Sequence, residues 1–174
     1  MGERGFTLVE LMVTIAILAI VIAIAFPNFE GTMRSNRVAT TTNELIASLS
    51  LARVEALRSP GGAGICASAD GTACSGTWND GWLVWIDGDG DGTLGGENDQ
   101  VLRVVDARRK MEVEATTGAG AGTATTLAFD QRGRAVVPRT FHVQPDVCPD
   151  GQELRRKLTV NATGQVTVER ELCE

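Results

Sequence analysis

The sequence predicts an α+β protein in which one long N-terminal helix packs on an antiparallel β-sheet domain. Two observations lead to this prediction. An apolar run from Phe6 to Phe26 continues into an amphipathic helical pattern that extends to about Arg58. Beyond Gly64 the chain instead carries short β-branched segments that are separated by turn residues.

The first half of the predicted helix is apolar enough to enter a membrane. Phe6–Phe26 holds a single charged residue, Glu10, in 21 positions. As an α-helix it would be about 32 Å long, which is sufficient to cross a bilayer core. An ionisable residue inside such a segment is costly, and it is therefore a candidate for function. We predict a transmembrane helix over residues 6–29.

The second half of the helix has one broad apolar face, which we interpret as packing on the globular domain. Its apolar residues recur at spacings of three, four and seven. A strong stop signal follows at Ser59-Pro60-Gly61-Gly62, so the helix should end near Arg58. The residues that define the face are Val38, Leu45, Leu49, Ala52 and Ala56.

Seven segments after the helix have the length and composition of strands. Because they follow one another with short connections, we expect them to pair antiparallel and to be covered by the helix. The segments are Gly81–Ile86, Gln100–Val105, Met111–Ala115, Thr125–Phe129, Thr140–Val143, Lys157–Asn161 and Gln165–Glu169.

Composition limits the classes of function. The chain has 174 residues, of which 43% are hydrophobic, and this is enough for a packed core. Its net charge of −6 argues against a surface built to hold nucleic acid. The single histidine, His142, lies in a strand-like run, and we interpret it as structural. Since no set of acid, base and nucleophile emerges, we predict that the protein is not an enzyme.

The N-terminus allows three interpretations. A secretory signal peptide would be cut at Ala23-Ile24-Ala25, but the apolar run is too long for one and contains a carboxylate. A simple membrane anchor fits the length and leaves Glu10 unexplained. The third interpretation uses Gly5-Phe6-Thr7-Leu8-Val9-Glu10 together with the apolar run that follows. This combination resembles the class III signal of type IV prepilins.

The resemblance implies how the N-terminus is processed and used. A prepilin peptidase would cut between Gly5 and Phe6, release residues 1–5 as a leader and N-methylate Phe6. The helix would first anchor the subunit in the inner membrane and later pack in the core of a filament, with Pro27 as the family's kink proline. There Glu10 is expected to pair with the buried N-terminal amine of a neighbouring subunit, because a buried charge requires a partner. The alternative is that Glu10 only extends its carboxylate to the membrane surface, and this would require neither Gly5 nor Phe6.

Three stretches of the remaining chain resemble minor pilins and pseudopilins of the GspH/FimT type. The resemblance implies that residues 30–174, including the amphipathic half of the helix, form a pilin-like domain in the bacterial periplasm on a single-pass anchor. The stretches read NDGWLVWID at 79–87 with VLRV at 101–104, LAFDQRGR at 127–134, and RKLTVNATGQVTV at 156–168.

All four cysteines lie outside the helix and would face an oxidising compartment in this topology. Four cysteines allow three pairings. Their spacings match no common zinc pattern, so a metal site is the weaker interpretation. We favour local disulfides, Cys66 with Cys74 and Cys148 with Cys173. The first would close a glycine-rich loop, and the second would pin the C-terminal tail.

Residues 87–92, Asp-Gly-Asp-Gly-Asp-Gly, resemble the opening of an EF-hand calcium loop. The bidentate glutamate that such a loop needs is replaced by Asn98, and the flanking elements are predicted strands, so a true EF-hand is not expected. A solvated hairpin loop is one interpretation. The other is a calcium site formed by Asp87, Asp89, Asp91 and Asp99, and apart from calcium we expect no cofactor.

The leading hypothesis for function is a minor pilin of the FimU/FimT type, which would prime assembly of a type IV pilus and lie at or near its tip. Its partners would be other minor and major pilins and the prepilin peptidase. The alternative is a GspH-type minor pseudopilin, which performs the analogous task in type II protein secretion. The tail pattern Cys148…Arg156…Gly164…Cys173 looks more like the pilus group.

A DNA receptor for natural transformation is a third hypothesis. Some FimT-like proteins carry a GRxR motif near the C-terminus whose arginines contact DNA phosphate. At the matching place this chain reads Gly164-Gln165-Val166-Thr167, without either arginine. Its other basic clusters are short, so we expect nucleic acid to bind weakly or not at all.

Overall fold

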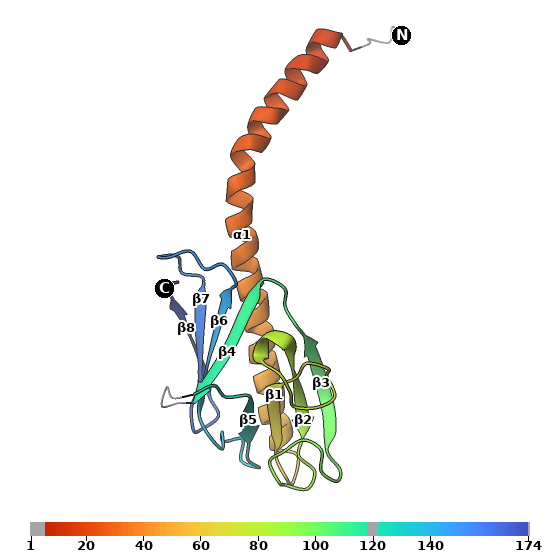
Figure 1. Cartoon of the computed structure of the whole chain (residues 1–174), viewed down its shortest axis with the longest axis vertical. Helices are drawn as coiled ribbons and strands as arrows, with labels where there is room; N and C mark the ends of the chain where they lie inside the picture. The colour runs from red at the N-terminus through yellow and green to blue at the C-terminus, as the bar shows by residue number, and fades with distance from the viewer. Residues whose placement is uncertain (1–5, 118–121, 174) are drawn as a thin grey trace. The chain divides into compact units, whose positions relative to one another are not determined.

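The structure is a computed structural model that describes residues 6–117 and 122–173, and the side chains of these residues except at positions 24–29. The chain divides into two compact units, residues 1–36 and 37–174. One helix, α1 (Leu8–Ala56), runs from the first unit into the second (Figure 1). It confirms the predicted helix to within two residues at each end. Gly5 and the side chain of Pro27 lie outside the described residues, so the cleavage site and the kink stay predictions.

In the described part of the chain, the second unit contains eight strands and one short 3-10 helix, η1 (Trp78–Asp80). Seven of these strands confirm the predicted segments, with ends that differ by at most two residues. The prediction was wrong in omitting the first strand. The strands are β1 (Ala63–Ala67), β2 (Gly81–Ile86), β3 (Gln100–Asp106), β4 (Met111–Thr117), β5 (Thr126–Phe129), β6 (Arg139–Pro145), β7 (Arg155–Val160) and β8 (Val166–Glu171).

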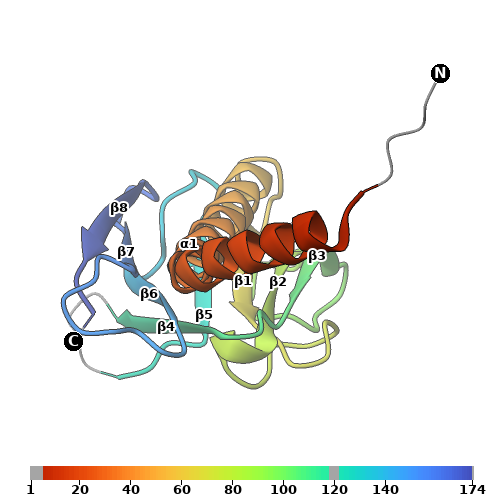
Figure 2. The same cartoon turned by 90° about the horizontal axis from the view of Figure 1, so that it is seen from above.

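The strands form two antiparallel sheets rather than one. Sheet A has the strand order β3-β2-β1-β5, and sheet B has the order β4-β6-β7-β8. Seen from above in Figure 2, β2 and β3 lie on one side of the part of α1 that belongs to the second unit, and β7 and β8 lie on the other. The predicted α+β architecture is therefore confirmed, and its division into two sheets was not predicted.

The apolar face of α1 lies in a core that it shares with both sheets. The face packs in one cluster with Ile65 and Leu127 of sheet A and with Phe141 and Leu158 of sheet B. Full burial of a leucine side chain stabilises a fold by roughly 1.5–3 kcal/mol, so this face is enough to hold the helix on the sheets. The five residues that predicted the face, Val38, Leu45, Leu49, Ala52 and Ala56, are all fully buried.

The missed strand, β1, lacks the signals by which strands are recognised. Its sequence is Ala-Gly-Ile-Cys-Ala, and it lies between β2 and β5. All five residues are buried because Ala63, Ile65 and Ala67 pack in the core with α1, while Gly64 and Cys66 lie under Trp85 and its neighbours on the other face. A strand buried on both faces shows no alternation of apolar and polar residues. Gly64 is needed because the ring of Trp85 lies directly over it, where a Cβ atom would overlap the indole. Packing rather than propensity makes this segment a strand.

Both predicted disulfides are confirmed. Cys66 pairs with Cys74 across a Cα–Cα distance of 5.6 Å, and Cys148 pairs with Cys173 across 5.4 Å. The second disulfide is supported by backbone hydrogen bonds on both sides of the tail, since Gly151 donates its N–H to Cys173 and Cys173 donates its N–H to Gln152. The C-terminal tail is therefore fastened to the loop between β6 and β7.

Candidate assembly site

The helix begins with a cap made by residues of the N-terminal motif. The Glu10 N–H donates to Thr7 Oγ1 at 3.2 Å, and the Leu11 N–H donates to the Thr7 carbonyl at 3.2 Å. Thr7 is thus the N-cap, and Glu10 occupies the third helical position, where a carboxylate is favoured by the helix dipole. This cap was not predicted, although the spacing Thr-x-x-Glu is a capping signal.

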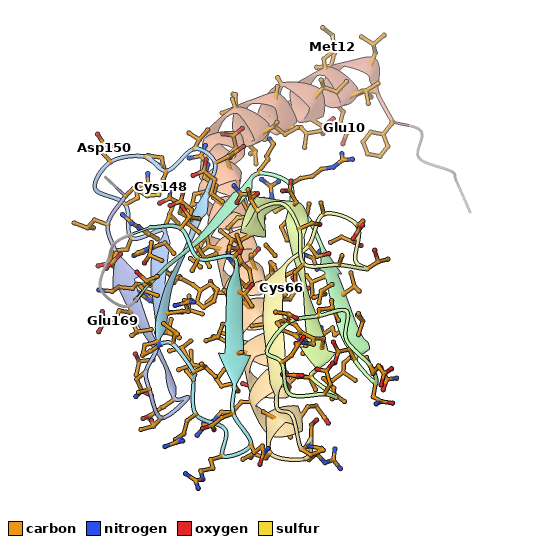
Figure 3. All side chains as sticks on the ribbon, turned by 60° about the horizontal axis from the view of Figure 1, so that its bottom comes forward. Glu10, Met12, Cys66, Cys148, Asp150 and Glu169 are labelled. Carbon is orange, nitrogen blue, oxygen red and sulfur yellow. A yellow bond between two sulfur atoms is a disulfide. The ribbon has the colours of Figure 1, made fainter. Side chains whose placement is uncertain are left out.

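The first unit exposes apolar side chains on all sides of its helix. Figure 3 shows Glu10 and Met12 projecting from different sides of this part of α1. An apolar surface of this extent needs lipid or other helices to cover it. The residues concerned are Phe6, Leu8, Val9, Leu11, Met12, Val13, Ile15, Ile17, Leu18, Ile20, Val21 and Ile22, each between 52% and 78% exposed.

Within the residues that the structure describes, no helix is long and apolar enough to cross a membrane.

The acidic loop between β2 and β3 brings three of its four predicted calcium ligands together. Oxygen atoms of Asp87, Asp89 and Asp99 lie within 4.8 Å of one another, and Asp87 is buried. Asp91 is not part of this group, because its Oδ1 accepts the N–H of Thr93 at 2.7 Å instead. Carboxylate oxygens are the donors that calcium prefers, so the chemistry of the group fits the ion.

Backbone N–H groups already hold these carboxylates in place. Asp87 accepts the N–H groups of Gly90 and Gly92 at 2.7 and 2.8 Å. Asp99 accepts the N–H of Gly88 at 2.8 Å, and this bond is the main reason why the pKa of Asp99 is lowered. The loop is thus organised by its own backbone, and calcium binding stays a prediction.

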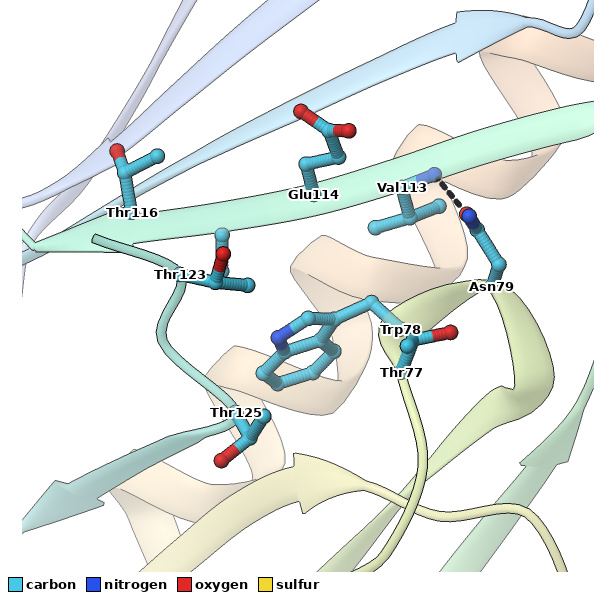
Figure 4. A pocket seen from close by; sticks show the side chains of 9 residues that line it. Thr77, Trp78, Asn79, Val113, Glu114, Thr116, Thr123 and Thr125 are labelled. Carbon is cyan, nitrogen blue, oxygen red and sulfur yellow. Dashed lines mark hydrogen bonds between the residues drawn. The ribbon is translucent and has the colours of Figure 1, made fainter.

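A pocket of about 170 Å³ opens between η1, β4 and residues 123–125 (Figure 4). The Trp78 indole N–H donates to the Ala124 carbonyl at 2.6 Å, and Asn79 Oδ1 accepts the Val113 N–H at 2.6 Å. Among the described lining residues, Glu114 is the sole titratable group. The two hydrogen bonds connect η1 to residue 124 and to β4 at this pocket. The described lining residues offer no combination of acid, base and nucleophile.

His142 lies on the outer face of sheet B. Its Nε2 is 3.7 Å from Glu171 Oε2, in a group that also includes Arg155 and Lys157. Burial lowers the pKa of His142, and the neighbouring Arg155 cation acts in the same direction. His142 thus contacts charged side chains of β7 and β8 across sheet B, which is typical of a structural residue.

The short basic clusters lie at residues 108–110, 132–134 and 155–157, and at least one cation of each is engaged in an ion pair. Arg108 Nε donates to Glu44 Oε2 at 2.8 Å. Arg134 lies 2.7 Å from Asp130, and Lys157 lies 3.5 Å from Glu171. Such pairing reduces the charge that these clusters can offer to a polyanion.

Two family models match the sequence. The model described as type II transport protein GspH matches residues 41–164, and the model described as the prokaryotic N-terminal methylation motif matches residues 1–26. No curated protein and no solved structure shows a significant match.

A capped helix that begins in a methylation motif and ends in the core of two antiparallel sheets defines a pilin-like subunit. Since the GspH model covers well over half of its length, the chain belongs to the GspH family and is a pilin-like protein of the GspH/FimT type. Such proteins are membrane-anchored structural subunits that are processed by a prepilin peptidase and assemble with other pilins.

Proposed function

We propose that this protein is a minor pilin that primes assembly of a type IV pilus and is incorporated at or near its tip. The observation that carries this proposal is the C-terminal tail held by the Cys148–Cys173 disulfide. The tail pattern is the feature in which the sequence resembles the pilus group more than the secretion group. We also propose the bacterial inner membrane as the site of anchoring, with the second unit in the periplasm, where disulfides persist.

The proposed role of the N-terminal motif rests on charge burial. Cleavage after Gly5 leaves Phe6 with a free amine, which becomes a cation among apolar helices when the subunit enters a filament. Burying such an ion without a partner costs several kcal/mol. Glu10 lies in the first turn of α1, one turn from the new N-terminus. Its carboxylate is the partner that we assign to the amine of a neighbouring subunit.

The test is a deletion strain of the source bacterium that is complemented with the wild-type chain or with Glu10→Val. Pili sheared from the cells are quantified, and the subunit is followed by immunoblot in membranes and pili. We expect the deletion to lose pili and the wild type to restore them. Glu10→Val should be cleaved and methylated normally, because it removes only a costly charge from the membrane segment, yet fail to enter pili. Normal piliation of the deletion strain would contradict the proposal.

A second candidate is a GspH-type minor pseudopilin of type II secretion. It is favoured by the description of the matching family model, which names type II transport. In this case the deletion would stop export of folded proteins into the medium and leave surface pili unchanged. Assaying both pili and exported proteins in the same strains therefore separates the two candidates.

A further inference from the structure

Two turns in different sheets are built in the same way. Residues 130–134 follow β5 of sheet A, and residues 161–165 connect β7 to β8 in sheet B. In the first, Asp130 Oδ1 accepts the N–H groups two and four residues ahead, both at 2.9 Å. In the second, Asn161 Oδ1 accepts the equivalent N–H groups, both at 3.0 Å. The fourth residue of each is a glycine with positive φ, +68° at Gly133 and +74° at Gly164.

One side chain of α1 donates to both turns. Arg53 Nε donates to the Gly133 carbonyl at 3.0 Å, and Arg53 Nη2 donates to the Thr163 carbonyl at 3.0 Å. A guanidinium is planar and presents several N–H donors in a fixed fork, so a single arginine can serve two carbonyls in one geometry.

The two glycines allow this approach. A Cβ atom on Gly164 would overlap the Gly133 carbonyl oxygen and lie 3.0 Å from Arg53 Nε. A Cβ atom on Gly133 would lie 3.2 Å from Leu57 Cδ2 and 3.3 Å from Arg53 Cγ. Both glycines are buried, so the turns contact each other with no side chain between them.

The hydrogen bonds of Arg53 lie at one end of sheet B. Another connection, between η1 and sheet B, lies at the opposite end. Near the Met111 end of β4, the Val113 N–H donates to Asn79 of η1. The strand register places Thr117, at the other end of β4, beside Arg139, which pairs in turn with Val160. The turn that contacts Arg53 begins directly after Val160. Sheet B is therefore attached at both of its ends.

We propose that Arg53 is a positioning residue that fixes sheet A and sheet B relative to each other. Without it, sheet B keeps its core contacts, its attachment at η1 and the hydrogen bond that Arg139 Nε of β6 donates to the Thr126 carbonyl of β5 at 3.0 Å. The turn at 161–165 then gains freedom to move away from the turn at 130–134. Arg53 thereby sets the relative position of the outer faces of the two sheets, and with it the shape that the subunit presents to a partner. This inference goes beyond the assembly role and applies equally to a pilus or a pseudopilus subunit.

The test uses the full-length chain in detergent micelles with both disulfides intact. Nitroxide labels are attached through ketone-bearing residues at Val104 of β3 and Val168 of β8, which are 46% and 45% exposed, and their separation is measured by pulsed electron resonance. Hydrogen exchange of the two turns is measured in parallel. We expect Arg53→Met to broaden the distance distribution and to speed exchange in both turns by about tenfold, since each loses a bond from a charged donor. Arg58→Met, which removes an exposed arginine paired with Glu55, is the matched control and should behave as the wild type.

An unchanged distance distribution in folded Arg53→Met would overturn the inference, and so would faster exchange in one turn alone. A change that merely weakened the core would lower the melting temperature without broadening the distribution. If Arg53→Met does not fold, Arg53→Lys provides the test, because lysine keeps the charge and donates from one nitrogen instead of a planar fork. A distribution broader than the wild type is expected for this variant, and one as narrow as the wild type refutes the role of the fork.

Discussion

Ser48 is a buried hydroxyl whose removal gives a sharp test of how α1 is held on sheet A. Its Oγ accepts the Trp82 indole N–H at 3.0 Å and donates to the Glu44 carbonyl at 2.9 Å. Ser48 is fully buried and Trp82 is 1% exposed, so water cannot replace the hydroxyl as acceptor. Ser48→Ala therefore leaves a buried donor without a partner.

The expected cost follows from two opposing effects. An unsatisfied buried donor costs about 1–3 kcal/mol. Alanine regains a few tenths of a kcal/mol because it is the better helix former. The net loss is about 1–2 kcal/mol, which lowers the melting temperature of a chain of this size by roughly 2–8 °C.

The assay is a reversible thermal melt of the full chain in detergent, followed by circular dichroism. Ser50→Ala is the matched control, since Ser50 lies on the same helix and is exposed. Trp82→Phe removes the donor, so Ser48→Ala should cost less in that background. The reasoning is refuted if Ser48→Ala costs no more than Ser50→Ala, or if its cost is the same in both backgrounds.

Four further predictions concern the tail, the acidic loop, His142 and DNA. Replacing both Cys148 and Cys173 by serine should lower the free energy of unfolding by about 2–4 kcal/mol, measured by denaturant titration, and an unchanged midpoint would contradict the role of the tail disulfide. Millimolar calcium should raise the melting temperature of the wild type and of Asp91→Asn but not of Asp89→Asn, because only a ligand of the folded state stabilises it, and an unchanged wild-type melt would leave the solvated hairpin as the explanation. The pKa of His142 is lowered from its ordinary value of 6.5, so the unfolded state takes up the proton first. The contribution of His142 to the free energy of unfolding should therefore be complete above pH 6.5 and decrease as the pH falls below this value. His142→Gln should reduce this slope in urea titrations between pH 7.5 and 5.5, whereas an identical slope would show that other groups cause it. Fluorescence anisotropy should detect little binding of duplex DNA at physiological salt, and tight binding would reverse our expectation.

Sequence patterns were sufficient to recognise the N-terminal methylation motif, whereas the arrangement of the acidic loop was predicted only in part. The motif around Phe6 and Glu10 is contiguous, so it could be recognised without a fold. Asp91, the fourth proposed calcium ligand, lies outside the group of three because its carboxylate accepts the Thr93 N–H, and this contact depends on how the loop folds back on itself. The cap that Thr7 provides was missed although its Thr-x-x-Glu spacing was visible in the sequence.

Local sequence signals were enough to predict the helix and seven of the strands and to favour the two local disulfides, because each depends mainly on residues that are not far apart in the chain. Periodicity predicted the buried face of α1, and short loops favour pairing between neighbouring cysteines. By contrast, the strand β1 and the contacts of Arg53 with both turns became evident from the folded chain and not from its sequence. Gly64 becomes part of a central strand because Trp85 packs over it, and the two hydrogen bonds of Arg53 reach residues 80 and 110 positions away. Such contacts carry no local signal, because their free energy depends on where the packed core brings distant backbone carbonyls.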